Sequence, residues 1–125
     1  MRVLYVDDEA DIREVAELSL ALNPAWEIKT AANGAEALRL IEDWTPQVVL
    51  LDVMMPMMDG PQTLEAIRRR WPAESLPVIF ITARVLATDR SRLMSLGAAG
   101  VIAKPFDPMK LAADVATVMS QHGPV

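Results

Sequence analysis

The apolar run VVLL at residues 48–51 constrains the fold of this chain more than any other stretch. Two of its residues are β-branched, and a run of this length predicts a strand that is buried on both faces of a parallel sheet. Asp52 follows at once, and a turn-rich loop over residues 53–60 comes next. Open α/β sheets bind ligands at the carboxyl ends of their strands, so Asp52 is a candidate functional residue. The alternative is an aspartate that only caps a loop.

Segments with strand and helix patterns alternate five times along the chain, with short connections. Apolar runs predict strands over residues 3–6, 27–31, 48–51, 78–82 and 100–103. Apolar residues at helical spacing, with proline and glycine near the segment ends, predict helices over about residues 9–22, 34–45, 60–71, 88–96 and 108–120. Such an alternation calls for a parallel sheet with helices on both of its faces.

Two of the predicted helices carry charged groups near an end. Asp8 and Asp11 resemble a capping arrangement at the start of the first helix, in which Val15 and Leu22 belong to the apolar residues at helical spacing. The three arginines at 68–70, near the end of the third helix, are expected mostly on a solvent-exposed face.

Length and composition exclude several classes of protein. The chain has 125 residues, which suits a single domain; we expect a core over residues 2–120, a loose tail at 121–125 and no output domain. A net charge of −5 and an isoelectric point near 4.8 argue against nucleic-acid binding. No apolar run approaches the roughly 18 residues of a membrane span, and no signal sequence opens the chain, so we expect a cytoplasmic protein without membrane contact. The absence of cysteine excludes disulfides and thiol catalysis.

Polar side chains stand at the ends of four predicted strands, namely Asp7 with Asp8, Asp52, Thr82 and Lys104. Parallel strands joined by right-handed crossovers end at the same edge of a sheet, so these groups can converge. Three neighbouring carboxylates repel one another and need a cation, and oxygen ligands without histidine or cysteine favour Mg²⁺. A carboxylate, Mg²⁺, a lysine and a hydroxyl are the groups that phosphoryl transfer to an aspartate requires.

Four short motifs occur in order, each at the end of a predicted strand. They are VDDE at 6–9, LDVMMPMMDG at 51–60, ITA at 81–83 and KPF at 104–106. With these motifs the chain resembles the response-regulator receiver domains of two-component signalling, especially the single-domain chemotaxis-regulator type, over residues 2 to about 120. The resemblance implies a flavodoxin-like α/β fold, with a five-stranded parallel sheet in the order 2-1-3-4-5 and five helices.

The resemblance also implies roles for the acidic residues. Asp52 is expected to be phosphorylated, in the presence of Mg²⁺, by a phosphohistidine on a sensor histidine kinase or a histidine phosphotransfer protein. Asp8, Asp52 and the main-chain carbonyl of Met54 are expected to bind Mg²⁺ directly, with Asp7 acting through water. Such a domain is a switch and not a conventional enzyme, because it catalyses only its own phosphorylation and dephosphorylation.

The remaining site residues receive positioning roles from the same resemblance. Thr82 and Lys104 are expected to hold phosphoryl oxygens, and a cis peptide bond before Pro105 is expected to direct the lysine into the pocket. Val101 stands where the family has an aromatic residue that reports phosphorylation, and valine cannot perform that movement. We therefore expect the face around residues 83–104 to signal to a downstream protein by moving its weakly anchored helix.

Two alternatives stay open at this point. A Mg²⁺-dependent phosphohydrolase of the haloacid dehalogenase type also forms an aspartyl phosphate, but it needs a second aspartate two residues after the nucleophile, where this chain has Met54. A degenerate receiver would act only as a binding module. The presence of all five site residues argues against it: Asp7, Asp8, Asp52, Thr82 and Lys104.

Overall fold

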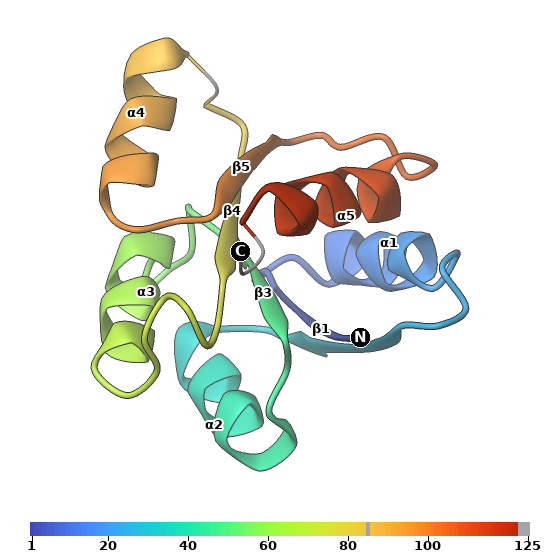
Figure 1. Ribbon diagram of the computed structural model, residues 1–125, viewed down its shortest axis with the longest axis horizontal. Coiled ribbons are helices and arrows are strands. Elements are labelled where there is room, and N and C mark those ends of the chain that lie inside the picture. The colour runs from blue at the N-terminus through green and yellow to red at the C-terminus, as the bar shows by residue number, and fades with distance from the viewer. Residues whose placement is uncertain (85, 123–125) are drawn as a thin grey trace.

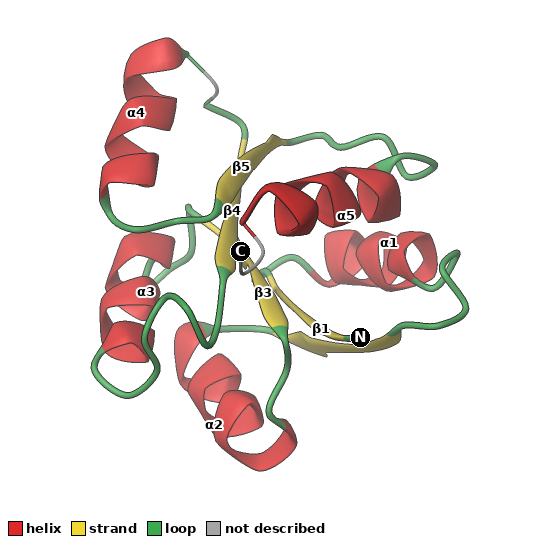
Figure 2. Cartoon of the chain, in the orientation of Figure 1, coloured by secondary structure: helices red, strands yellow, loops and turns green. Residues whose placement is uncertain are grey.

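The computed structural model describes residues 1–84 and 86–122, and its five parallel strands form one sheet (Figure 1, Figure 2). The strands are β1 (Arg2–Val6), β2 (Glu27–Ala31), β3 (Val48–Asp52), β4 (Val78–Thr82) and β5 (Gly100–Ala103). Their order across the sheet is β2-β1-β3-β4-β5. The predicted flavodoxin-like order is therefore confirmed, and β3 takes the central position.

The described residues form five helices. These helices cover both faces of the sheet, as Figure 1 shows. They are α1 (Ala10–Leu20), α2 (Gly34–Trp44), α3 (Gly60–Arg68), α4 (Ala87–Ser95) and α5 (Leu111–His122). α1 and α5 lie together on one face, and α2, α3 and α4 lie on the other. Each face therefore has its own apolar cluster, and the sheet is covered on both sides as an all-parallel sheet requires.

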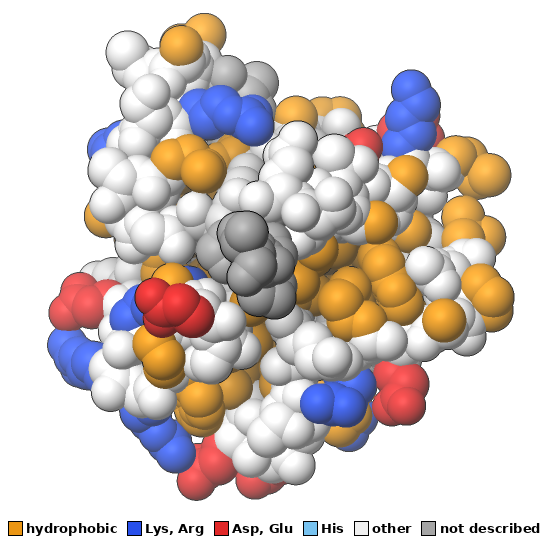
Figure 3. All heavy atoms as spheres, in the orientation of Figure 1, with side chains coloured by type: hydrophobic (Ala, Val, Ile, Leu, Met, Phe, Trp, Pro, Cys, Tyr) orange, Lys and Arg blue, Asp and Glu red, His pale blue; other side chains and the backbone are white. Residues whose placement is uncertain are grey.

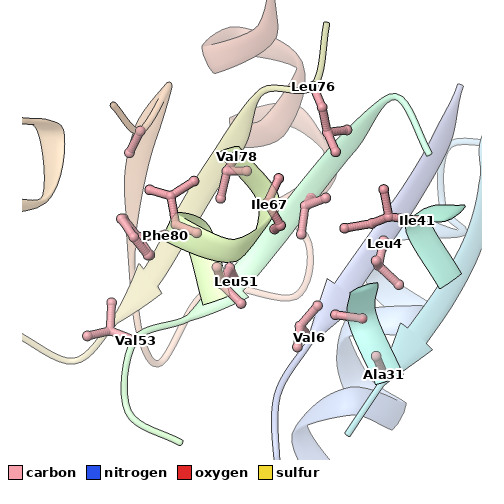
Figure 4. Close-up of a cluster of buried hydrophobic side chains, with 14 of the residues drawn as sticks. Leu4, Val6, Ala31, Ile41, Leu51, Val53, Ile67, Leu76, Val78 and Phe80 are labelled. Atoms are coloured by element: carbon pink, nitrogen blue, oxygen red, sulfur yellow. The ribbon is translucent and has the colours of Figure 1, made fainter. Parts of the chain in front are cut away.

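β3 explains why residues 48–51 are uninterrupted in their apolar character. Every residue of this strand is buried, and alternate side chains enter different clusters. Val49 and Leu51 pack with side chains from α2 and α3 (Figure 4), whereas Val48 and Leu50 pack with side chains from α1 and α5. Asp52 still pairs with β4, so the strand extends one residue beyond its predicted end and carries the carboxylate as its last residue.

The start of α1 differs from the prediction. The helix begins at Ala10 after Glu9, and the predicted capping role of Asp8 is wrong. Instead, Asp7 Oδ1 accepts a hydrogen bond of 2.9 Å from the main-chain N–H of Glu9. This hydrogen bond stabilises the turn that leads into α1. Aspartate readily makes such local bonds from its side chain to the backbone.

The face that α1 buries is also narrower than its apolar pattern predicts. The buried residues are Ala16, Ser19 and Leu20. Val15 is 39% exposed, and Leu22 lies beyond the end of the helix at 57% exposed. Together with the exposed Leu18 and Met109, they bring apolar side chains to the surface over α1 and the adjoining end of α5 (Figure 3).

The predicted solvent-exposed position is wrong for Arg68, which is partly buried. Its Nη1 donates hydrogen bonds to the main-chain oxygens of Leu76 at 2.8 Å and Trp71 at 3.3 Å. Burial lowers the pKa of this guanidinium. α3 ends at Arg68, and the chain that returns to β4 passes over it, whereas Arg69 and Arg70 are exposed as expected.

The last helix continues further than the predicted core. α5 includes residues 121 and 122, which were expected in the loose tail, and residues 123–125 lie outside the described part of the chain. Among the described residues, none of the helices has both the length and the apolar composition that crossing a membrane requires.

Candidate functional site

The carboxyl ends of the strands bring the predicted acidic residues together. Asp7 and Asp8 follow β1, and Asp52 ends the neighbouring β3. One carboxylate oxygen from each of these three residues lies within 4.8 Å of the others. Asp7 and Asp52 are buried, whereas Asp8 is exposed at the mouth of the cluster. β2 ends at Ala31 and contributes no polar side chain.

Lys104 reaches into this acidic cluster from the end of β5. Its Nζ lies 2.9 Å from Asp7 Oδ2, 3.6 Å from Asp52 Oδ2 and 3.8 Å from Glu9 Oε1. Burial alone would lower the pKa of Lys104, but the hydrogen bond to Asp7 and the charges of the carboxylates outweigh it and raise the pKa. The lysine is therefore a permanent cation. Its peptide bond to Pro105 is cis, which confirms that prediction.

Asp7 is fully buried and receives hydrogen bonds on both carboxylate oxygens. Oδ1 accepts from Glu9 N, and Oδ2 accepts from Lys104 Nζ at 2.9 Å and from Tyr5 Oη at 3.1 Å. Its main-chain oxygen accepts from Arg13 Nη1 at 2.7 Å. These donors satisfy the hydrogen-bonding capacity of the buried carboxylate, which would otherwise be unfavourable in the core.

Asp52 is only 3% exposed and has fewer compensating contacts than Asp7. Burial, reinforced by the negative charge of Asp7, raises the pKa of Asp52 to about 6, although Lys104 and the Met54 main-chain N–H act in the opposite direction. At neutral pH this carboxyl group is therefore largely ionised, and it is held in a place where the negative charge is unfavourable. Such a carboxylate favours binding of a cation beside it.

Thr82 and Lys104 are held next to each other by the sheet. Thr82 pairs with Ala103 on β5, and Lys104 N donates to the main-chain oxygen of Thr82 at 2.8 Å. The Thr82 hydroxyl accepts a hydrogen bond of 3.0 Å from the N–H of Arg84. The threonine is thus buried at the same edge as the acidic cluster, with its hydroxyl engaged by the loop that leads toward α4.

A cavity of about 470 Å³ opens at this edge of the sheet, with Asp52 and Lys104 in its wall. The other lining residues are Glu9, Ile12, Val15, Met54, Ala83, Pro105 and Phe106. The cavity is therefore charged at its base and largely apolar along its sides. A phosphate-sized group can approach Asp52 through this cavity. The rest of β3 is buried in the core.

Gly60 is required by the loop that bounds the site. Its N–H donates to the main-chain oxygen of Val53 at 2.9 Å, which folds the loop back onto β3. A Cβ at this position would lie 2.6 Å from the main-chain oxygen of Asp52 and 2.8 Å from Val53 Cα. Any side chain would therefore displace the backbone that carries Asp52, which explains the glycine at the end of the MMDG segment.

Two aromatic residues near the site were not predicted to have a role in it. The sequence pattern places Tyr5 in an apolar strand, and in the structure its hydroxyl donates to Asp7 Oδ2. The available signal is spacing, because Asp7 directly follows β1 and lies two residues after Tyr5, which favours side chains on the same face. Phe106 belongs to the KPF motif and lines the cavity.

The donor set fits a hard divalent cation. The clustered ligand atoms are all carboxylate oxygens, one from each of Asp7, Asp8 and Asp52. Mg²⁺ prefers such oxygen ligands and usually keeps several waters, which suits a cluster with one exposed carboxylate at its mouth. The residues present therefore fit Mg²⁺ better than a transition metal that favours nitrogen or sulfur.

Two curated proteins are similar to this chain in sequence. The response regulator Rre1 of Synechocystis sp. is 36% identical over 120 residues, which cover 96% of this chain and 52% of that protein. A probable transcriptional regulator, ycf27 of Guillardia theta, is 39% identical over 94% of this chain and 45% of its own length. The chain thus spans about half the length of the curated relatives it matches.

Solved structures show the same fold. The chemotaxis protein CheY4 of Vibrio cholerae superposes with a TM-score of 0.84 at 31% identity, covering 94% of this chain and 97% of that one. The receiver domain of the Francisella response regulator 1452 gives a TM-score of 0.83 at 27% identity, covering 96% and 97%. The family described as response regulator receiver domain matches residues 3–116. The chain therefore belongs to the response regulator receiver domain family.

Proposed function

We propose that this chain accepts a phosphoryl group on Asp52 from a phosphohistidine of a sensor histidine kinase or histidine phosphotransfer protein. Receiver domains act generally as phosphoacceptors in two-component signalling. The observation that carries the assignment to Asp52 is its position: a buried carboxylate at the end of the central strand, in the wall of the cavity and 3.6 Å from Lys104 Nζ. Asp7 is covered by donors, and Asp8 is exposed to solvent.

Mg²⁺ is the proposed cofactor of this reaction. Asp8, Asp52 and the main-chain carbonyl of Met54 would hold the ion, and Asp7 would contact it through water. When bound, the ion supplies positive charge that reduces the repulsion between the acidic cluster and the incoming phosphate. Support comes from the three carboxylate oxygens within 4.8 Å of one another.

The proposed transfer replaces one bond to phosphorus by another. An oxygen of the ionised Asp52 forms the new P–O bond, the P–N bond to the donor histidine breaks, and the histidine keeps that electron pair. Lys104 and the Thr82 hydroxyl would hold phosphoryl oxygens, for which Lys104 has to turn from Asp7 toward Asp52. To end the signal, water attacks the phosphorus, the P–O bond to Asp52 breaks, and the carboxylate keeps that electron pair. This second step releases inorganic phosphate and regenerates the free aspartate.

The proposed output is a change in contacts with a downstream protein over the face around residues 83–104. Val101 is buried in the cluster on the α4 side of the sheet, where it pairs with Phe80, so it is not placed to move in and out of solvent. α4 buries only Leu93 among its own residues. We propose that a movement of Thr82 and the loop after it shifts α4 as a rigid body. We also propose that the phosphoryl transfer and the contact with the downstream protein take place in the cytoplasm.

Intact-mass measurement after incubation with Mg²⁺ and acetyl phosphate tests the assignment of Asp52. One added phosphoryl group is expected on the parent chain and none on Asp52→Asn. Asp59→Asn is the matched control, because asparagine can keep the N-cap bond that Asp59 makes with Gln62 N at the start of α3. Labelling of Asp52→Asn to the level of the parent would refute the assignment.

A further inference from the structure

Tyr5, the only tyrosine of the chain, connects the apolar layer under the sheet with the acidic pocket. Its ring is fully buried in the cluster on the α1 and α5 side. The ring meets Phe106, which lines the cavity, edge-on at 6.3 Å between centroids and 71° between planes. Packing therefore fixes the ring, and the position of the hydroxyl is fixed with it.

The two donors to Asp7 Oδ2 differ in their freedom to move. Tyr5 Oη, at 3.1 Å, sits on a rigid ring. Lys104 Nζ, at 2.9 Å, sits on a flexible side chain that also lies 3.6 Å from Asp52 Oδ2. Asp7 Oδ2 therefore has one permanent donor and one donor that it shares with Asp52.

We propose that Tyr5 is a positioning residue that keeps Asp7 hydrogen-bonded when Lys104 turns to a phosphoryl group on Asp52. This inference rests on the proposed function, because it takes Lys104 as the group that contacts the phosphoryl oxygens. A buried carboxylate that loses a donor is destabilised unless another donor satisfies it. The Tyr5 hydroxyl supplies that donor and so lowers the free energy needed to release Lys104.

The proposal separates two affinities that a general structural role would change together. Mg²⁺ alone leaves Lys104 on Asp7, whereas Mg²⁺ with beryllofluoride, an analogue of the phosphoryl group, draws Lys104 toward Asp52. In Tyr5→Phe the affinity for beryllofluoride at saturating Mg²⁺ should fall about tenfold, as for one hydrogen bond to a charged group. The affinity for Mg²⁺ alone should change less than about twofold, because Lys104 still satisfies Asp7. Titration calorimetry measures both.

Two further variants distinguish positioning from packing. Ser19→Ala removes another buried hydroxyl on the same side of the sheet, one without a hydrogen-bond partner among the described residues, and should change neither affinity. In a Lys104→Met chain, Tyr5 is the remaining donor to Asp7 Oδ2 in both states. Adding Tyr5→Phe to that chain should therefore change both affinities by the same factor, and the selective loss should disappear.

The single tyrosine also provides a spectroscopic test. With ¹³C at its Cζ, Tyr5 should give one resonance that shifts when beryllofluoride is added to the Mg²⁺-bound chain, and this shift should be absent from Asp7→Asn.

Equal weakening of both affinities by Tyr5→Phe, or no weakening of either, would overturn the positioning role while leaving Asp52 as the phosphoacceptor. A parent chain that neither binds beryllofluoride nor becomes phosphorylated at Asp52 would overturn the proposed function and this inference together.

Discussion

β3 contains two kinds of buried environment within five residues. The side chains of residues 48–51 are fully buried and apolar, and Asp52, at 3% exposed, is buried almost as completely. Burial of each apolar side chain stabilises the fold by roughly 1.5–3 kcal/mol. Burial of Asp52 raises its pKa to about 6, which means that its ionised form is less stable in the folded chain than in the unfolded chain.

This difference shows how the candidate site is maintained. The apolar core around residues 48–51 stabilises the fold. This stabilisation offsets the unfavourable burial of the ionised Asp52 carboxylate at the end of the strand. The unfavourable charge is also what makes the pocket attractive to a cation. Variants at the apolar and acidic parts of β3 test this difference, and a comparison of α3 with α4 extends it to the helices that follow β3 and β4.

Leu51→Ala tests the apolar part of the strand. The side chain of Leu51 is fully buried against the helices on the α3 side of the sheet. Its truncation should therefore lower the free energy of unfolding by about 3–4 kcal/mol. Urea denaturation followed by circular dichroism measures the change. Leu18→Ala, at a position 68% exposed on α1, is the control and should change it by less than about 0.5 kcal/mol. Similar losses in the two variants would break the comparison.

Asp52→Asn tests the polar end of the same strand and should have the opposite sign. Without divalent ions at pH 7.5, the variant should be more stable than the parent by about 2 kcal/mol, because the buried negative charge is gone. Excess Mg²⁺ should reverse the order, since it stabilises the folded parent by binding. Thermal unfolding in EDTA and in Mg²⁺ measures both, with Asp59→Asn as control. An Asp52→Asn chain less stable than the parent in EDTA would contradict this account.

The pH dependence of that difference follows from the direction of the pKa change. The pKa of Asp52 in the folded chain, about 6, lies above the value of about 3.9 expected in the unfolded chain. Ionisation therefore destabilises the folded parent fully above pH 6, and this effect fades as pH falls toward about 4. In EDTA the advantage of Asp52→Asn should shrink over the same interval; an advantage that grows on acidification would exclude Asp52 as its source.

Asp8→Ala separates the exposed carboxylate of the cluster from the buried ones. Because Asp8 is exposed, its removal should leave the stability in EDTA nearly unchanged. It should nevertheless weaken Mg²⁺ binding at least about tenfold, since a direct ligand is lost. Calorimetric titration with Mg²⁺ measures this, and Asp11→Ala, in the exposed first turn of α1, is the control. Parent-like Mg²⁺ affinity in Asp8→Ala would remove it from the proposed ligand set.

Amide hydrogen exchange compares α3, which follows β3, with α4, which follows β4. α3 buries Leu64 and Ile67 and begins with a capping box, whereas α4 buries only Leu93 of its own residues. Local opening of α4 should therefore require about 1 kcal/mol less free energy than opening of α3. Adding Mg²⁺ with beryllofluoride should change protection across residues 86–96. Protection that changes only elsewhere would rule out α4 as the route of the signal.

The order of elements could be predicted from the sequence, because each strand and helix has a local signal. The apolar runs at 78–82 and 100–103 coincide with β4 and β5, and the resemblance to receiver domains carried the strand order. Boundaries and helix faces were less predictable. Arg68 and Leu22 were misplaced because their environments depend on where the chain goes after the helix ends, which periodicity does not contain.

Asp7, Asp8, Asp52, Thr82 and Lys104 could be chosen as candidates from the sequence alone. The sequence shows polar residues at the ends of four of these apolar runs, and in a parallel sheet the carboxyl ends of the strands lie at the same edge. How these residues share their contacts depends on the tertiary structure: Lys104 lies nearer to Asp7 than to Asp52, and the Tyr5 hydroxyl also donates to Asp7. Distances and burial arise from packing between segments remote in sequence. The pKa of Asp52 depends on both, so it follows from the assembled fold and not from the residues by themselves.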